Sequence, residues 1–147
     1  MFLTGSSGFV GKNIISYFDE QIPITKYIRG SIINILGDIV IHLAGKAHDL
    51  KKVTSDTDYY LINTEFTKQV FDAFLVSDAK VFILLSSVKA VADVIEGELT
   101  EDIVPNPVTH YGKSKLLAEQ YIFSKTVPRC KRIYIAPVYD SWCWQQG

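Results

Sequence analysis

Tyr111 and Lys115 stand four residues apart in the segment YGKSK, and together they can transfer a proton. Residues at this spacing share one face of a helix. Tyrosine is a poor base near neutral pH because its reference pKa is about 10, but a nearby ammonium stabilises the phenolate and lowers that pKa. The pair can therefore move a proton to or from a hydroxyl or a carbonyl. Out of context, the same spacing usually marks an ordinary surface pair.

Two other segments add chemistry to this pair. Ser87 closes the apolar run KVFILLSS and can hydrogen-bond the substrate oxygen that the tyrosine serves. The segment TGSSGFVG places three glycines between the first predicted strand and the first predicted helix. Gly5 can form the tight turn, Gly8 can let a pyrophosphate approach the backbone, and Gly11 can let the helix pack on the strand. The pyrophosphate would lie at the positive end of that helix. The alternative is a flexible turn without a ligand.

The elements that position these residues alternate along the chain. Short apolar runs predict strands over residues 1–5, 24–29, 38–45, 80–87 and 131–137. Apolar residues at helical spacing predict helices over residues 9–21, 59–75 and 111–125. Strands that alternate with helices indicate the α/β class, with a parallel, doubly wound sheet.

Composition narrows the function further. The chain has 147 residues, enough for one domain with a core, and is 48% hydrophobic and 21% charged, as in globular proteins. A net charge of -1 gives no electrostatic reason to expect nucleic acid or a membrane surface as a partner. The apolar runs are too short to cross a bilayer. Cys130 and Cys143 form neither a disulfide framework nor a metal cluster, so we expect no metal and a cytoplasmic location.

Taken in order, these motifs resemble the extended short-chain dehydrogenase/reductases of the NAD-dependent epimerase/dehydratase family. The closest likeness is to nucleotide-sugar epimerases of the UDP-glucose 4-epimerase type. The segments DIVIHLAGKAHD, YYLINTEFTKQVFDAF and PNPVTHYGKSKLLAE also match family segments, so the likeness covers residues 1–135. It implies a Rossmann-like domain that binds NAD or NADP. It also implies that the chain is truncated after the tyrosine helix and the strand that follows this helix.

The resemblance also implies residue roles. Tyr111 is similar to the family's acid/base, Lys115 to its partner that also holds the nicotinamide ribose, and Ser87 to the serine that orients the substrate. Ser86 would lie beside the nicotinamide, and Asn63 would support the site from the central helix. The cofactor-binding residues implied in this way are Gly5, Ser7, Gly8, Phe9, Val10, Gly11, Arg29, Leu43, Ala44, Gly45, Asn63, Ser86, Tyr111 and Lys115.

The implied activity is 4-epimerisation of a nucleotide sugar, and the predicted substrate is a UDP-sugar. In such a reaction a hydride moves from the sugar to the nicotinamide, and the keto sugar rotates within the site. The hydride then returns to the opposite face of the sugar. A sugar-nucleotide dehydratase or a keto-sugar reductase is an alternative, although dehydratases tend to carry an Asp-Glu pair where Val88 and Lys89 stand. A non-catalytic NAD(P)-binding protein is a third possibility, and the retention of Ser87, Tyr111 and Lys115 argues against it. The apolar faces of the two long helices predict a homodimer.

Several positions depart from the family pattern. Arg29 ends the second strand where NAD-binding relatives carry an acid, and it either binds the 2′-phosphate of NADP or is simply solvated. The stretch between the second and third strands is too short for the usual helix, so the adenine pocket is expected to be incomplete. His110 precedes the tyrosine and is interpreted as a loop residue. Lys46, His48 and Lys89 either face the sugar nucleotide or belong to loops.

Residues 136–147 form a tail that matches nothing in the family and holds both tryptophans. Relatives continue here with a glycine-containing segment and run to about twice this length. Because tryptophan has a single codon, a one-base forward shift forces glycine at Trp142 and again at Trp144, which restores that pattern. We therefore expect an out-of-frame tail, a missing C-terminal substrate domain and an inactive fragment, with a genuine divergent tail as the alternative. Sequencing the encoding DNA tests this, and a shifted frame without a family-like continuation contradicts it.

Overall fold

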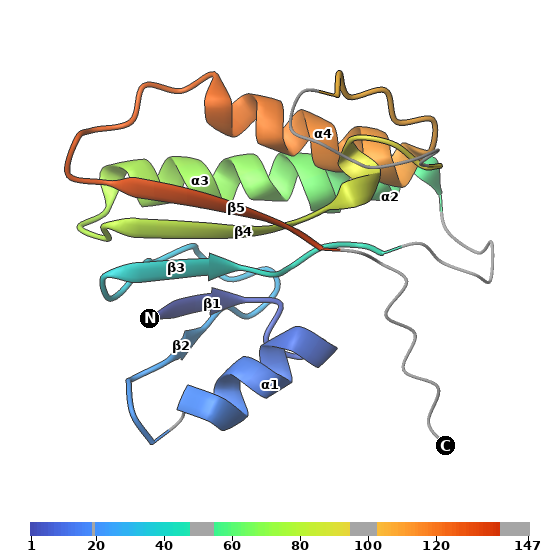
Figure 1. Ribbon diagram of the computed structural model, residues 1–147. Helices are drawn as coiled ribbons and strands as arrows, with labels where there is room; N and C mark the ends of the chain where they lie inside the picture. Colours follow the sequence, from blue (N-terminus) through green and yellow to red (C-terminus); the bar gives the residue numbers. More distant parts are fainter. Residues whose placement is uncertain (19, 48–54, 95–102, 139–147) are drawn as a thin grey trace, which may run out of the picture.

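The computed structural model describes residues 1–18, 20–47, 55–94 and 103–138, so His48 and most of the predicted out-of-frame tail lie outside the described residues. Five strands form one parallel sheet in the order β2–β1–β3–β4–β5 (Figure 1). The strands are β1 (Phe2–Thr4), β2 (Thr25–Lys26), β3 (Ile39–His42), β4 (Val81–Ser87) and β5 (Arg132–Val138). The predicted Rossmann-like α/β fold is confirmed.

The helices are α1 (Phe9–Phe18), α2 (Asp56–Tyr59), η1 (Tyr60–Glu65), α3 (Phe66–Val76), η2 (Val88–Ala90) and α4 (His110–Phe123). The single helix predicted over 59–75 is interrupted, because η1 is a π-helix between α2 and α3. The strand predicted over 24–29 shrinks to the two residues of β2, and no helix connects it to β3, as the short connection predicted. β5 continues through the first three residues of the predicted tail.

The direction of each crossover decides which face of the sheet a helix covers. The chain moves one way from β1 to β2 through α1, and the opposite way from β3 to β4 and β5 through α3 and α4. Because strand–helix–strand connections in parallel sheets are right-handed, the two directions place their helices on opposite faces. Figure 1 shows α1 on one side of the sheet and α3 and α4 on the other.

The main core lies between the sheet and α3. Phe71 and Phe74 on α3 and Phe82 on β4 are fully buried, and the rings of Phe71 and Phe82 meet edge to face with centroids 5.0 Å apart. Alternate residues of β4 point to this core, because side chains of a strand alternate between the two faces of a sheet. The core therefore fixes α3, and with it η1, against the sheet.

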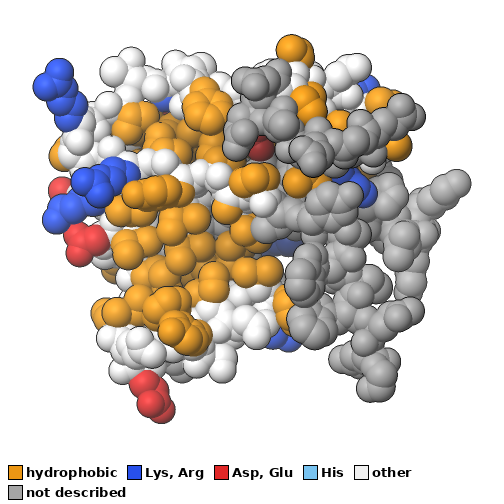
Figure 2. All heavy atoms as spheres, viewed as in Figure 1, with side chains coloured by type: hydrophobic (Ala, Val, Ile, Leu, Met, Phe, Trp, Pro, Cys, Tyr) orange, Lys and Arg blue, Asp and Glu red, His pale blue; other side chains and the backbone are white. Residues whose placement is uncertain are grey.

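The opposite face of the sheet is only partly covered by the described residues. Ile41, Ile83 and Tyr134 lie in register across β3, β4 and β5, and each side chain keeps some exposure. Figure 2 shows hydrophobic side chains gathered over the strands at the centre of the view. In α1, Gly11 is buried against the backbone of Gly5 and Ser6, and Ile14, Ile15 and Phe18 are partly buried.

The parallel register brings the carboxyl ends of the central strands to one edge of the sheet. Thr4 at the end of β1 pairs with His42 at the end of β3, and His42 pairs with Leu84 in β4. The segments that follow these strands therefore lie close together. Two of them are the glycine turn after β1 and the Ala44-Gly45 segment after β3, and the third is η2, which follows Ser87 at the end of β4.

Candidate active site

The glycine turn after β1 is held by close backbone contacts. Gly5 has φ +70°, and a Cβ there would lie 2.7 Å from the backbone nitrogen of Ala44. A Cβ on Gly11 would lie 2.3 Å from the carbonyl oxygen of Gly5. A Cβ on Gly8 would meet nothing closer than that same oxygen at 3.4 Å. The fold therefore requires glycine at Gly5 and Gly11, whereas a Cβ on Gly8 would make only an ordinary van der Waals contact with the protein.

An open cleft of about 750 Å³ lies along this turn and the end of β3. Seven of its lining residues are among the predicted cofactor-binding residues: Gly5, Ser7, Gly8, Arg29, Leu43, Ala44 and Gly45. Six more line it that the sequence did not assign to the cofactor: Ser6, Tyr27, Lys46, Asp58, Ile62 and Phe66. The helical spacing of Ile62 and Phe66 could have indicated a shared face, but nothing local indicates that this face meets the glycine turn.

Lys115 on α4 does not line this cleft but lies beside one of its lining residues, Gly45. Its ammonium donates a hydrogen bond to the carbonyl oxygen of Leu85 at 2.6 Å, and the residue is only 7% exposed. A Cβ on Gly45 would lie 3.9 Å from the Lys115 Nζ and 3.3 Å from the Oδ1 of Asn63. Lys115 therefore lies next to Gly45, which lines the cleft.

Helix α4 carries Tyr111 and packs on η2, the short helix that follows Ser87. A Cβ on Gly112 would lie 2.3 Å from the carbonyl oxygen of Lys89, so the first turn of α4 touches η2 directly. Ser87 caps the start of η2, because its hydroxyl accepts a hydrogen bond from the Lys89 N–H at 3.2 Å. Tyr111 is 6% exposed, and its ring packs against Tyr59 with centroids 6.3 Å apart.

Asn63 links the two halves of the site through its buried amide. Its Oδ1 accepts from the backbone N–H of Lys46 at 2.7 Å, and its Nδ2 donates to the Lys46 carbonyl at 3.1 Å. The same Nδ2 donates to the hydroxyl of Ser114 at 3.0 Å, which in turn donates to the carbonyl oxygen of Tyr111 at 2.7 Å. Asn63 lies in η1, and π-helical turns often occur at functional sites.

Asp93 fixes the start of α4, a role for which no local pattern provides a signal. Its carboxylate accepts hydrogen bonds from the Thr109 N–H at 2.9 Å and the Thr109 hydroxyl at 2.6 Å. Burial acts to raise the pKa of Asp93, but the hydrogen bonds from Thr109 and Val108 outweigh it and lower the pKa. Thr109 in turn caps α4 by accepting from the Gly112 N–H at 3.1 Å.

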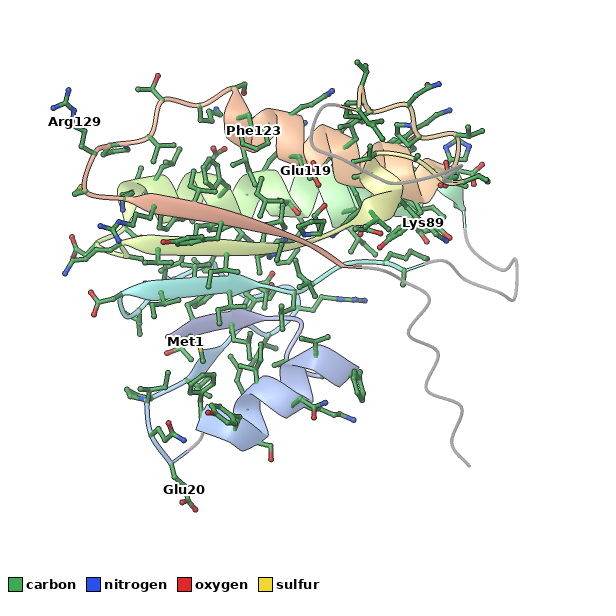
Figure 3. All side chains as sticks on the ribbon, in the orientation of Figure 1. Met1, Glu20, Lys89, Glu119, Phe123 and Arg129 are labelled. Atoms are coloured by element: carbon green, nitrogen blue, oxygen red, sulfur yellow. The ribbon has the colours of Figure 1, made fainter. Side chains whose placement is uncertain are left out.

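Ser86 lies on the side of β4 that faces α4. Its hydroxyl donates to the Oε1 of Glu119, and the residue is 1% exposed. Burial raises the pKa of Glu119, although the hydrogen bond from Ser86 and the charge of Lys115 act in the opposite direction. Figure 3 shows Glu119 on the side of α4 that faces the sheet. A contact between Ser86 and the nicotinamide stays a prediction.

Other predicted residues lie nearer the surface. Phe9 and Val10 are 72% and 39% exposed, so their expected role rests on backbone groups at the start of α1. His110 begins α4, where its Nδ1 lies 2.9 Å from the Tyr60 hydroxyl and its Nε2 lies 3.4 Å from Asp56. Among the residues that the structure describes, no group of three His, Cys, Asp or Glu side chains is arranged to hold a metal ion.

Lys46 and Lys89 take different places. Lys46 lines the cleft, where its ammonium lies 3.1 Å from Asp58. Lys89 lies in η2 beside Ser87, near the carboxyl edge of the sheet (Figure 3). Neither side chain belongs to a core, so both stay candidates for contact with a substrate.

A parallel sheet with this glycine turn is the arrangement of a dinucleotide-binding α/β protein. The profile of the NAD dependent epimerase/dehydratase family matches residues 29–126, and the chain belongs to this family. Enzymes of the family depend on NAD or NADP. No helix within the described ranges is long and apolar enough to cross a membrane.

Two curated relatives match along most of the chain. A GDP-6-deoxy-D-talose 4-dehydrogenase from Aggregatibacter actinomycetemcomitans is 26% identical over 137 residues, which cover 82% of this chain and 46% of that protein. A GDP-6-deoxy-D-mannose reductase from Pseudomonas aeruginosa is 27% identical over an alignment that covers 95% of this chain and 51% of that protein. The chain thus spans about half the length of the curated relatives it matches.

Solved structures share the fold. A UDP-glucuronic acid 4-epimerase from Bacillus cereus in complex with NAD has a TM-score of 0.76 at 20% identity, with 94% of this chain and 56% of that chain covered. RMD from Pseudomonas aeruginosa complexed with NADPH has a TM-score of 0.73 at 26% identity, with 94% of this chain and 52% of that chain covered. The neighbours therefore include proteins with either dinucleotide bound.

His42 makes the stability of this arrangement dependent on pH. It is fully buried between the hydroxyls of Thr4, 2.7 Å from its Nδ1, and Thr67, 2.8 Å from its Nε2. Burial lowers its pKa to about 3, and the charge of Lys115 acts in the same direction. The free-histidine pKa is about 6.5, so between about pH 6.5 and 3 the unfolded chain binds a proton that the folded chain does not.

We predict that the free energy of unfolding falls by about 1.4 kcal/mol per pH unit below 6.5 through this group. Urea unfolding between pH 7.5 and 5 measures the slope. His42→Gln should be less stable at pH 7.5 and should lack this part of the slope, whereas the exposed-site control His110→Asn should keep it. Parallel pH curves for the wild type and His42→Gln would contradict the prediction.

Proposed function

We propose that this chain is the cofactor-binding half of an NAD(P)-dependent enzyme that acts on a nucleotide sugar. The observation that carries the proposal is the position of Gly45, which lines the cleft along the glycine turn and lies beside the ammonium of Lys115. A dinucleotide whose pyrophosphate lay at Gly8 would extend along this cleft towards Ser87, Tyr111 and Lys115. Gly8 lines the cleft and the fold itself does not require glycine there, which supports a ligand at this position.

The proposed roles divide among the chain's own residues. The backbone around Gly8 and the N-terminus of α1 would bind the pyrophosphate. Ser87 would orient the reacting hydroxyl or carbonyl of the sugar, Tyr111 would exchange a proton with that oxygen, and Lys115 would stabilise the phenolate. The bound dinucleotide would supply the hydride chemistry. Asp93, Asn63 and Glu119 would act through position rather than by contact with the substrate.

We propose sugar 4-epimerisation as the reaction, and keto-sugar reduction is the second candidate. The likeness to epimerases rests on the motif order and on the fold. The reductase candidate is favoured by the names of the two curated relatives, a 4-dehydrogenase and a reductase that act on GDP-6-deoxy sugars. UDP-sugars stay our predicted substrates, and GDP-sugars are the competing substrates to test beside them. A cytoplasmic location and a homodimer through α3 and α4 stay predictions, and sedimentation can test the dimer.

The first test is dinucleotide binding. Gly8→Ala should raise the dissociation constant for NADH and NADPH at least about tenfold, because a Cβ would occupy the space proposed for the pyrophosphate. Its unfolding midpoint should stay near that of the wild type, since its Cβ meets nothing closer than 3.4 Å. Fluorescence titration and urea unfolding measure the two effects.

Gly11→Ala is the matched control, because its Cβ would lie 2.3 Å from a backbone oxygen and should destabilise the fold itself. A Gly8→Ala chain that binds both dinucleotides as tightly as the wild type would remove the proposed pyrophosphate site.

The same titration tests the choice between NAD and NADP. Arg29 lines the cleft, and a guanidinium fork suits a phosphate group. If Arg29 binds the 2′-phosphate, Arg29→Ala should weaken NADPH binding about tenfold and NADH binding hardly at all. Equal effects on both dinucleotides, or none on either, would instead assign Arg29 to solvent.

Product analysis tests the reaction. We expect this chain alone to turn over UDP- and GDP-sugars at a rate near zero, because it spans about half of its relatives. In a longer version that continues as the relatives do, a C4 epimer without net cofactor use would support epimerisation, and net oxidation of NADPH would support reduction. Tyr111→Phe should abolish either activity. Full activity of that variant would establish a non-catalytic role for Tyr111.

A further inference from the structure

Helix α4 holds the end of β4 through two polar contacts that lie one helical turn apart. The ammonium of Lys115 donates to the carbonyl oxygen of Leu85 at 2.6 Å, and the hydroxyl of Ser86 donates to Glu119. Lys115 and Glu119 share a face of α4 because they are four residues apart. The two contacts therefore grip the two residues that directly precede Ser87.

The Glu119 contact lies inside the interface between helix and sheet. Ser86 is 1% exposed, and a buried hydroxyl without a partner carries a free-energy cost. Glu119 meets that need, and its carboxylate lies within the electrostatic reach of Lys115. The family resemblance implies that Ser86 lies beside the nicotinamide, and the hydroxyl of this serine is held by Glu119.

We propose that Glu119 is a positioning residue that, through Ser86, fixes the end of β4 relative to Lys115 and Tyr111. This inference rests on the proposed function, because it assigns Glu119 to the nicotinamide half of the site. The Lys115 ammonium is hydrogen-bonded to Leu85 and lies 3.9 Å from the position of a Cβ on Gly45. A shift of Leu85 would therefore move this ammonium with respect to the cleft. A shift of Ser86 would move Ser87 directly.

An ordinary interface hydrogen bond is the competing explanation. Loss of such a bond would lower the stability of the domain and affect every part of the cleft alike. A positioning role predicts a local effect, because the glycine turn lies on β1 and α1, whereas Glu119 acts on β4. Ligands that occupy different parts of the cleft can separate the two explanations.

The first experiment titrates the chain with NADPH, NADH and ADP-ribose, which lacks the nicotinamide. Glu119→Ala should weaken dinucleotide binding about tenfold and ADP-ribose binding less than about twofold, since a hydrogen bond to a carboxylate is lost at one end of the site only. Glu119→Gln should stay within about threefold of the wild type, because its amide oxygen can still accept from Ser86. Glu65→Ala, which removes an exposed carboxylate paired with Lys68, is the matched control.

The second experiment needs no ligand. Amide hydrogen exchange over residues 85–89 should be faster in Glu119→Ala and in Ser86→Ala than in the wild type, and unchanged in Glu119→Gln. The double variant should exchange no faster than either single variant, because both changes remove one interaction. If the wild type binds neither dinucleotide nor ADP-ribose, the proposed function fails while the exchange data still decide whether Glu119 anchors β4. Unchanged exchange in Glu119→Ala, or equal weakening of NADPH and ADP-ribose binding, would overturn the inference.

Discussion

The side-chain amide of Asn63 joins the two regions on which the candidate site depends. It binds both backbone polar groups of Lys46, at the cleft, and the hydroxyl of Ser114, on the tyrosine helix. An amide has both donors and acceptors, so one buried side chain can satisfy a strand-end loop and a helix at once.

The buried polar contacts around Asn63 form one connected system. Thr67 donates to the carbonyl oxygen of Asn63 and also contacts His42, which contacts Thr4 on β1. The hydroxyl of Thr4 accepts from the backbone N–H of Ala44 at 3.2 Å. In the described part of the chain, every fully buried side-chain nitrogen and oxygen has a hydrogen-bond partner. Networks that are fully satisfied favour one arrangement of the strands and helices, which the geometry of proton transfer requires.

Sequence patterns predicted the parts of this protein that depend on local spacing. Alternating strands and helices gave the fold class, and the glycines at positions 5, 8 and 11 gave the turn after β1. The predictions were less accurate where distant contacts decide the outcome. The second strand was predicted too long, because only Thr25 and Lys26 pair with β1. The central helix was predicted as continuous, because the apolar spacing of Leu61, Phe66 and Val70 does not reveal a π-helical turn.

By itself, the sequence determined the order of the elements and the chemical groups available, since turn formation and helical spacing act over a few neighbouring residues. Only the tertiary structure decided which groups meet. Ser86 and Glu119 are 33 residues apart in the chain, and Asn63 and Ser114 are 51 apart. Such pairs form because the parallel sheet brings the carboxyl ends of its strands to one edge and α4 packs across them. No local pattern in the sequence carries that information.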